Sequence, residues 1–260
     1  MTAQHSARDR AFSNDVERFQ KNIYQTAKGQ IRQAVLAADL AGLINAPTPL
    51  RVLDIGGGIG QVNQYFAQAG HAVMHTDIAP EMVVAAQVAH QQAGLSERYH
   101  YLTASLQQLP ELLTDEPPFD VVLCHAVLEW LAEPSQAIAA IAPLIKPGGW
   151  LSLMFYNKHA KAMANLVYGN FDYVKAGLKV KKKVRFSPQH PLSIQQVKGW
   201  VSGHNLTLCQ HSGVRCIHDY LREVSDQSRD DLIDMELRVR NQEPFRQLGR
   251  YQHFLLRAGV

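Results

Sequence analysis

The sequence predicts an α/β fold with a mostly parallel, twisted sheet, helices on both faces and an antiparallel strand near the C-terminus. Short apolar segments alternate with helical segments from Leu50 to Pro147, which is typical of parallel strands joined by crossover helices. The segment Phe119–His125 is apolar almost throughout, as expected of a strand buried on both faces. A glycine cluster at residues 56–60 follows the first strand, at the edge where such sheets bind ligands.

The elements of the first half can be assigned in chain order. Two helical segments are expected between Phe12 and Leu43, before the first strand. Pro80 suits the first turn of a helix, and the Pro-Gly-Gly sequence that begins at Pro147 predicts a turn. Strands are expected at Leu50–Ile55, Ala72–Thr76, Tyr99–Thr103, Phe119–His125 and Trp150–Phe155, and helices at Gln61–Ala69, Pro80–Ala93 and Pro134–Leu144.

The alternation stops after Asn157, and the segment from His159 to Pro191 does not resemble another strand-helix-strand unit. Ser193 and Gln196 form a capping-box pattern that opens a helix toward Trp200. Later elements are a strand over Asn205–Ile217 interrupted at Ser212-Gly213, a charged helix over Asp230–Asn241, and a closing strand over Gly249–Leu256. We therefore expect four parts: an N-terminal helical segment over the ligand site (1–45), an α/β core (46–158), a basic and aromatic insertion (159–192), and a C-terminal part completing the sheet and substrate site (193–260).

Composition indicates a globular protein with an ordinary core. Apolar residues make up 46% of the 260 residues and charged residues 19%. No apolar run approaches the roughly 20 residues of a membrane span, and Met1–Arg18 lacks the apolar stretch of a secretion signal. The three cysteines form no C-x-x-C pair, so we expect reduced thiols and a cytoplasmic protein.

The glycine run and a later aspartate predict a nucleoside cofactor. Glycines allow positive φ and a close approach of backbone to ligand, and Asp77 ends the second strand where its carboxylate can accept bonds from ribose hydroxyls. A dinucleotide-binding loop would need G-x-G-x-x-G, but Gly60 falls one residue early and Gln61 takes its place. The run, preceded by Asp54, instead resembles the first motif of S-adenosylmethionine-dependent methyltransferases with a Rossmann-like fold.

Other polar residues leave two interpretations open. Arg32 shares a helix face with Tyr24 and Lys28. This face is either a solvated basic stripe or a cover over the cofactor site, in which case Arg32 binds the methionine carboxylate of the cofactor. His125 follows the fourth strand and either contacts the cofactor or is a structural histidine. A metal is not expected, because the histidines at 204, 211 and 218 match no usual zinc spacing.

A basic segment suggests a nucleic-acid partner, although a solvated loop remains the alternative. Five cations lie within seven residues and are interleaved with aromatic residues nearby, which suits phosphate binding and base stacking. The cations are Lys179, Lys181, Lys182, Lys183 and Arg185.

Several strings together resemble one family over about Phe12 to Ala258, the bacterial tRNA 5-carboxymethoxyuridine methyltransferases. The most specific strings are H-A-V-L-E-W from His125, M-F-Y-N from Met154 and N-F-D-Y-V from Asn170. The resemblance implies a Rossmann-like methyltransferase fold, S-adenosyl-L-methionine as cofactor, and a tRNA carrying 5-carboxymethoxyuridine at the wobble position as substrate, converted to its methyl ester. It also implies cofactor contacts from Arg32, Gly56, Gly57, Asp77, Leu106, Gln107 and His125.

The expected chemistry needs no general base. A carboxylate with a pKa near 4 is ionised at neutral pH, so catalysis would come from positioning and from removal of water around the nucleophile. Tyr156, Asn157 and Arg215 are the candidates for positioning the substrate. Two alternatives stay open: a methyltransferase of a small carboxylic acid, and a non-catalytic nucleoside- or RNA-binding module. Oligomeric state is not predicted.

Overall fold

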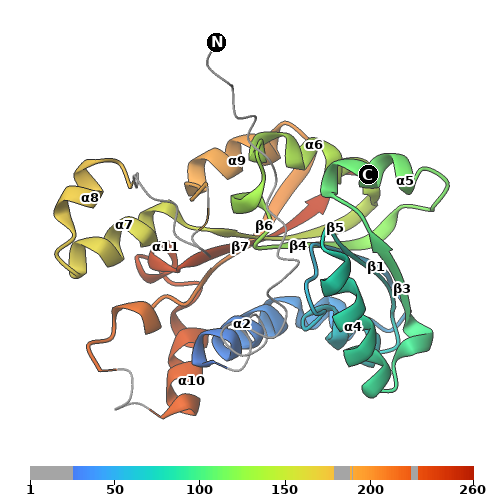
Figure 1. The fold of residues 1–260 in the computed structure, drawn as a ribbon, viewed down its shortest axis with the longest axis horizontal. Coiled ribbons are helices and arrows are strands. Elements are labelled where there is room, and N and C mark those ends of the chain that lie inside the picture. Colours follow the sequence, from blue (N-terminus) through green and yellow to red (C-terminus); the bar gives the residue numbers. More distant parts are fainter. Residues whose placement is uncertain (1–25, 179–187, 189, 224–227) are drawn as a thin grey trace.

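The computed structural model describes residues 26–178, 188, 190–223 and 228–260. Its centre is a seven-stranded sheet in the order β3-β2-β1-β4-β5-β7-β6 (Figure 1). Strand β7 is antiparallel to both of its neighbours, and the other paired strands are parallel. The strands are β1 (Arg51–Ile55), β2 (Ala72–Asp77), β3 (Tyr99–Thr103), β4 (Phe119–His125), β5 (Ile145–Tyr156), β6 (Leu206–Val214) and β7 (Tyr251–Ala258). The fold class predicted from the sequence is confirmed.

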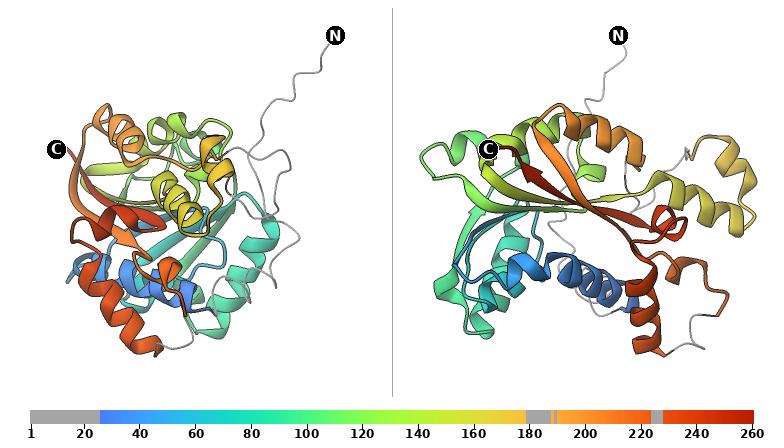
Figure 2. Two further views of the ribbon diagram at one scale, coloured as in Figure 1. Left: turned by 90° about the vertical axis from the view of Figure 1, so that its left-hand side faces the viewer. Right: turned by 180° about the vertical axis from the view of Figure 1, so that it is seen from behind.

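Helices cover both faces of the sheet (Figures 1 and 2). Helices α6 and α9 lie on one face, and α2, α4 and α10 lie on the other. The helices described are α2 (Ala27–Ile44), α3 (Asn63–Gln68), α4 (Pro80–Gln92), α5 (Leu109–Leu112), α6 (Ala137–Ile141), α7 (Lys158–Val167), α8 (Phe171–Lys175), α9 (Ile194–Ser202), α10 (Arg229–Val239) and α11 (Phe245–Leu248). Short 3₁₀ turns flank α6, so the helix expected over Pro134–Leu144 is present in three joined pieces.

A separate apolar core lies on each face. Ile138 of α6 and Val197 of α9 pack over Leu153 of β5, and all three side chains are fully buried. On the opposite face, Leu36 of α2 packs with Met154 of β5 in a cluster that also includes residues of α10. Full burial of an aliphatic side chain contributes about 1.5–3 kcal/mol, so these two cores hold the helices that flank the site.

Two boundaries expected from the sequence are wrong. Strand β5 begins at Ile145 rather than Trp150, because the Pro-Gly-Gly turn is an irregularity inside the strand, across which pairing with β4 shifts register. Strand β6 is not interrupted at Gly213; its register shift lies between Leu208 and Gln210. Glycine is required at position 213 for steric reasons, since a Cβ would lie 2.5 Å from the carbonyl oxygen of Arg246.

The described part of the segment 159–192 is largely helical. Helices α7 and α8 project from one side of the sheet, away from α4 and β3 (Figures 1 and 2). The capping box is confirmed: Ser193 accepts from the backbone N–H of Gln196 and opens α9. The basic cluster from Lys179 to Arg185 and the face residue Tyr24 lie outside the described residues, and the proposed division into four parts stays a prediction.

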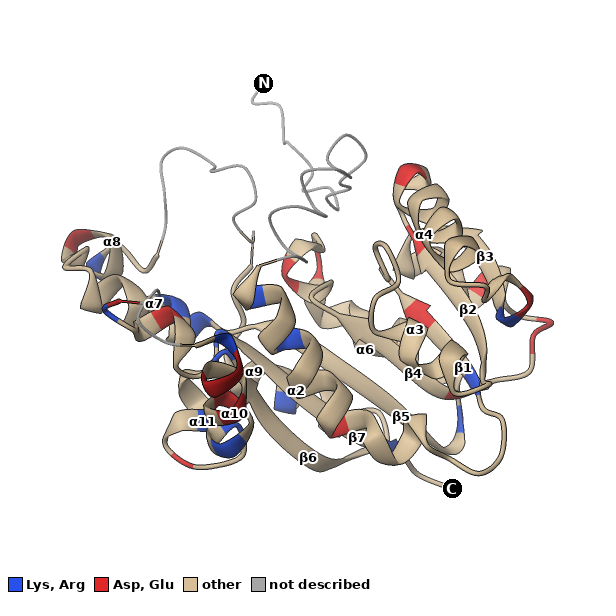
Figure 3. Cartoon of the chain, turned by 90° about the horizontal axis from the view of Figure 1, so that it is seen from below, with Lys and Arg blue, Asp and Glu red and all other residues tan. Residues whose placement is uncertain are grey.

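Charged residues gather on the outer helices. Acidic residues occupy the middle of α10 and an arginine lies near each end, which matches the charged helix expected near Asp230–Asn241 (Figure 3). Within the described ranges, no helix is both long and apolar enough to cross a bilayer.

Candidate active site

A cavity of about 360 Å³ opens at the carboxyl ends of the parallel strands. Its wall combines the glycine loop after β1, helix α2, the ends of β2, β4 and β5, and Arg215 and Tyr251 from the C-terminal part. This is the edge at which open α/β sheets bind ligands, and the size suits one small molecule.

The glycine loop forms a cradle of backbone atoms, packed so closely on its neighbours that side chains would not fit. Gly56 has φ of 65°, and a Cβ on it would lie 2.6 Å from a methyl carbon of Val127. A Cβ on Gly57 would lie 2.7 Å from the carboxylate of Asp54 and equally close to the ring of His75. Both contacts are closer than real Cβ atoms tolerate, so glycine is required at these positions for steric reasons.

Asp77 holds the loop from the end of β2 and lines the cavity. Its Oδ2 accepts from the backbone N–H of Gly58 at 3.0 Å, and its Oδ1 accepts from that of Ala79 at 2.9 Å. Burial raises the pKa of this carboxyl above its usual value, opposed by those backbone amides. A carboxylate has about four acceptor sites, so two bonds leave capacity for ribose hydroxyls.

A buried polar network supports the loop from below. Asn63 of α3 donates to Asp54 Oδ2 at 2.7 Å and accepts from the hydroxyl of Tyr99 at 2.9 Å. Burial raises the pKa of Asp54 to about 7, with the hydrogen bond from Asn63 acting against it. Burial also lowers the pKa of His75, to about 3, so this ring is neutral near pH 7. Asn63 and Tyr99 were not expected from the sequence, because nothing local marks them as partners of Asp54.

The predicted cofactor contacts largely converge on this cavity. Arg32 and Lys28 of α2 line it, while Leu36 from the same helix reaches both the cavity and the apolar core. Leu106 and His125 also line it. Gln107 is exposed and is not among the described residues that form the wall.

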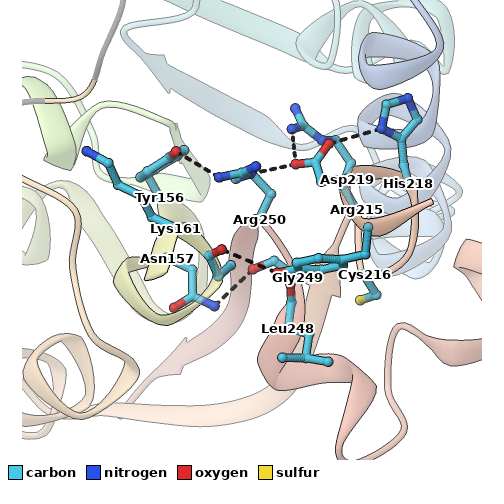
Figure 4. A network of polar contacts seen from close by, with 12 residues as sticks. Tyr156, Asn157, Lys161, Arg215, Cys216, His218, Asp219, Leu248, Gly249 and Arg250 are labelled. Atoms are coloured by element: carbon cyan, nitrogen blue, oxygen red, sulfur yellow. Dashed lines mark hydrogen bonds and ion pairs between the residues drawn. The ribbon is translucent and has the colours of Figure 1, made fainter. Parts of the chain in front are cut away.

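A charged cluster stands at the end of the cavity formed by the C-terminal part (Figure 4). Arg215 and Arg250 both donate to Oδ2 of Asp219, the bond from Arg250 Nε measuring 2.5 Å. Arg250 Nη1 also donates to the hydroxyl oxygen of Tyr156 at 3.1 Å, and His218 Nδ1 lies 3.0 Å from Asp219 Oδ1. Only Arg215 and Tyr156 of these five reach the cavity wall.

The cluster carries net positive charge. Burial raises the pKa of Asp219, but the hydrogen bond with His218 and the charges of Arg215 and Arg250 outweigh it and hold that pKa well below its usual value. One carboxylate therefore faces two guanidinium groups. The Nε atom of Arg215 is buried and has no hydrogen-bond partner among the described residues, so it is a donor that an acceptor in the cavity could satisfy.

Asn157 has a structural position beside this cluster. Its side-chain amide donates to the carbonyl oxygens of Gln247 and Gly249, and its oxygen accepts from the backbone N–H of His159 at the start of α7. These three bonds use the polar atoms of a fully buried side chain, and Asn157 is not part of the described cavity wall. Arg250 was missed by sequence reasoning, since it stands alone near the end of the chain and meets Tyr156 only through the pairing of β5 with β7.

Comparison with known proteins assigns the chain to a family. A family model described as a methyltransferase domain matches residues 53–153. The tRNA 5-carboxymethoxyuridine methyltransferase of Escherichia coli strain K12 is 42% identical over 254 residues, which is 96% of each chain. The chain belongs to the tRNA 5-carboxymethoxyuridine methyltransferase family. It is an S-adenosylmethionine-dependent methyltransferase, as the sequence predicted.

More distant relatives of this methyltransferase match it over a shorter stretch or at lower sequence identity. The ubiquinone biosynthesis O-methyltransferase of Xanthomonas euvesicatoria pv. vesicatoria is 36% identical over 120 residues, 46% of this chain and 48% of the relative. A similar solved structure is the magnesium protoporphyrin IX methyltransferase of Synechocystis with bound S-adenosylhomocysteine. It superposes with a TM-score of 0.64 at 17% identity, and the match covers 95% of this chain and 96% of the Synechocystis chain. That likeness shows the shared fold.

The cavity of this methyltransferase fits S-adenosylmethionine. The glycine cradle lines the cavity with backbone atoms alone, and Asp77 keeps free acceptor capacity beside it. In the described ranges, no cluster of three or more His, Cys, Asp or Glu side chains is arranged to hold a metal ion. Arg215 and Arg250 lie beyond residues 53–153, so the charged cluster is supplied from outside the general methyltransferase domain.

Proposed function

We propose that this enzyme transfers a methyl group from S-adenosylmethionine to the carboxylate of 5-carboxymethoxyuridine at the wobble position of tRNA, forming a methyl ester. One observation carries the proposal: a single cavity joins the glycine cradle at one end to a desolvated, net positive cluster at Arg215 at the other. The name of the Escherichia coli relative supports the choice of nucleotide.

The cofactor occupies the glycine end in this proposal. Gly56 and Gly57 let the backbone approach it, and Asp77 accepts bonds from its ribose. Arg32 reaches its carboxylate from α2, while Leu106 and His125 contact its remaining parts. Gln107 is also predicted to contact the cofactor. Its side chain is exposed, so in this proposal Gln107 lies beside the contact that Leu106 makes.

The substrate carboxylate is held at the other end by Arg215 and Tyr156. The hydroxyl oxygen of Tyr156 already accepts from Arg250, which leaves its O–H free to donate into the cavity. Arg215 binds one carboxylate oxygen while Asp219 offsets part of its charge. This matters because a carboxylate clamped on both oxygens by an arginine would be a poorer nucleophile. Asn157 then acts by holding α7 and the turn before β7 in place.

The reaction then depends on positioning. S-adenosylmethionine supplies an electrophilic methyl group when bound. The ionised carboxylate attacks the methyl group without losing a proton, so no general base is needed. The residues of this chain instead orient the carboxylate in line with the methyl group and exclude water from its surroundings. The half-buried aromatic rings of Tyr156 and Tyr251 stand 5.4 Å apart, edge to face, in that wall.

The rest of the tRNA binds along the basic segment in this proposal. Lys179, Lys181, Lys182, Lys183 and Arg185 would neutralise backbone phosphates, and they follow directly on α8, which ends at Lys175. Such a substrate is consistent with the cytoplasmic location expected from the sequence.

The test is methyl transfer from labelled S-adenosylmethionine into tRNA prepared from a strain lacking the enzyme. Arg215→Ala should lower kcat/KM about 10- to 100-fold, since a hydrogen bond to a charged group contributes roughly 1.5–3 kcal/mol. Arg238→Ala is the matched control, because that guanidinium is exposed on α10 and pairs with Asp234. Absence of transfer into tRNA that carries 5-carboxymethoxyuridine would refute the proposal.

A second candidate is methylation of a small carboxylic acid; the partial likeness to ubiquinone biosynthesis O-methyltransferases supports transfer to oxygen, without naming a carboxylic acid. Replacing Lys181, Lys182 and Lys183 together by alanine separates the two. The tRNA proposal requires weaker tRNA binding with a shallower salt dependence, whereas the small-molecule alternative requires unchanged activity.

A further inference from the structure

A continuous chain of hydrogen bonds crosses the sheet and ends at the cavity. Nδ1 of His253 lies 2.8 Å from Oδ2 of Asp39 on α2, and Nε2 of the same ring lies 2.8 Å from Oγ of Ser152. Ser152 Oγ lies 2.8 Å from Nε2 of His125, which lines the cavity. The four residues come from α2, β7, β5 and β4, so only the folded sheet brings them together.

The charges at the far end of this chain are balanced. Arg240, which directly follows α10, donates to Oδ1 of Asp39 at 3.0 Å, so one guanidinium already neutralises this carboxylate. Burial raises the pKa of Asp39, but its hydrogen bonds with His253, Ser212 and Arg240 outweigh burial and hold that pKa below its usual value, so the carboxyl is ionised. His253 and Ser152 are fully buried. A charged His253 would leave a net buried charge, so the neutral ring is favoured.

The ionised carboxylate then sets the direction of every bond. Asp39 can only accept, so Nδ1 of His253 carries a proton and Nε2 of that neutral ring accepts from the hydroxyl of Ser152. The oxygen of Ser152 accepts in turn from Nε2–H of His125. Burial, followed by the charge of Arg32, holds the pKa of His125 well below its usual value, so this ring is neutral as well.

We propose that Asp39, His253 and Ser152 are positioning residues that fix the tautomer of His125, so that its unprotonated Nδ1 presents a hydrogen-bond acceptor to the cofactor. Nδ1 has no hydrogen-bond partner within the described part of the chain. The matching group must be a donor, which S-adenosylmethionine offers in its ribose hydroxyls, adenine amino group and ammonium. The inference rests on the proposed contact of His125 with the cofactor and not on the tRNA substrate.

The tautomer can be measured in the free enzyme. In protein labelled with ¹⁵N-histidine, long-range ¹H–¹⁵N spectra distinguish protonated from unprotonated ring nitrogens, and His125→Gln assigns the signal among the 12 histidines. We expect one form of His125, protonated at Nε2 and unprotonated at Nδ1. A wild-type ring protonated at Nδ1 would overturn the proposal, because the bonds would then run in the opposite direction.

Cofactor binding tests the dependence on the chain. Ser152→Ala should release His125 into a mixture of tautomers and raise the Kd for S-adenosylmethionine about 3- to 10-fold in calorimetry, the effect of one hydrogen bond. Ser152→Thr, which keeps the hydroxyl, should restore both readouts. His211→Gln is the control, since that ring bonds Gln252 at 2.7 Å without joining the chain.

Unchanged Kd together with an unchanged His125 tautomer in Ser152→Ala would overturn the proposal. Both measurements omit tRNA, so a failure of the methylation assay leaves them interpretable. The wild-type spectrum needs no substitution, which keeps the test valid if Ser152→Ala does not fold.

Discussion

Glu129 should make the enzyme less stable as the pH rises, and Glu129→Gln should remove that dependence. This residue lies in the turn Leu128–Trp130 after β4 and is fully buried. Neither carboxylate oxygen has a hydrogen-bond partner among the described residues. Burial raises the pKa of the carboxyl from 4.5 to about 8, against nearby backbone amides and the charge of Arg32.

The sign and size follow from the two pKa values. Between pH 4.5 and about 8 the unfolded chain has lost the proton of Glu129 while the folded chain still binds it, so each rise in pH favours unfolding. One pKa unit corresponds to about 1.4 kcal/mol, which allows a loss of up to about 5 kcal/mol across this range. Glutamine does not ionise, so the variant lacks this loss.

The assay is urea unfolding of both proteins between pH 4.5 and 9, without cofactor. We expect the stability of Glu129→Gln relative to wild type to increase by a few kcal/mol from the acid to the alkaline end. Glu133→Gln, an exposed residue of the same loop, controls for general charge effects. Parallel pH profiles for wild type and Glu129→Gln would show that burial does not perturb this carboxyl as argued.

Three further substitutions test the site. Gly57→Ala should destabilise the fold by about 1–3 kcal/mol in thermal or urea unfolding, because its Cβ would press on Asp54 and His75; an unchanged midpoint would contradict the steric argument. Asp77→Asn should weaken S-adenosylmethionine binding about tenfold or more in calorimetry, since the amide removes acceptor capacity; wild-type affinity would exclude the ribose contact. Asn157→Ala should lower the free energy of unfolding by about 2–4 kcal/mol, because two buried backbone carbonyls lose their donor; a loss of activity with full stability would instead support a direct substrate role.

Local patterns predicted most of the sheet correctly. Strands β3 and β4 begin and end where the sequence placed them, and β4 is the clearer of the two because a strand buried on both faces has a distinctive apolar run. The errors came where glycine serves tertiary packing. The sequence predicts a break in β6 at Gly213, yet this glycine makes room for the backbone at Arg246, a residue far along the chain.

The sequence by itself determined the parallel α/β fold, the nucleoside-type glycine loop and the cofactor, because strand periodicity and glycine spacing are local properties. It also identified Arg215 and Tyr156 as candidates for the substrate end. Only the tertiary structure decided their partners, since Arg250 reaches Tyr156 and Asp219 through strand pairing that no local pattern encodes. The bond chain from Asp39 to His125 has the same origin: its members are far apart in sequence and meet through the order of β4, β5 and β7 in the sheet.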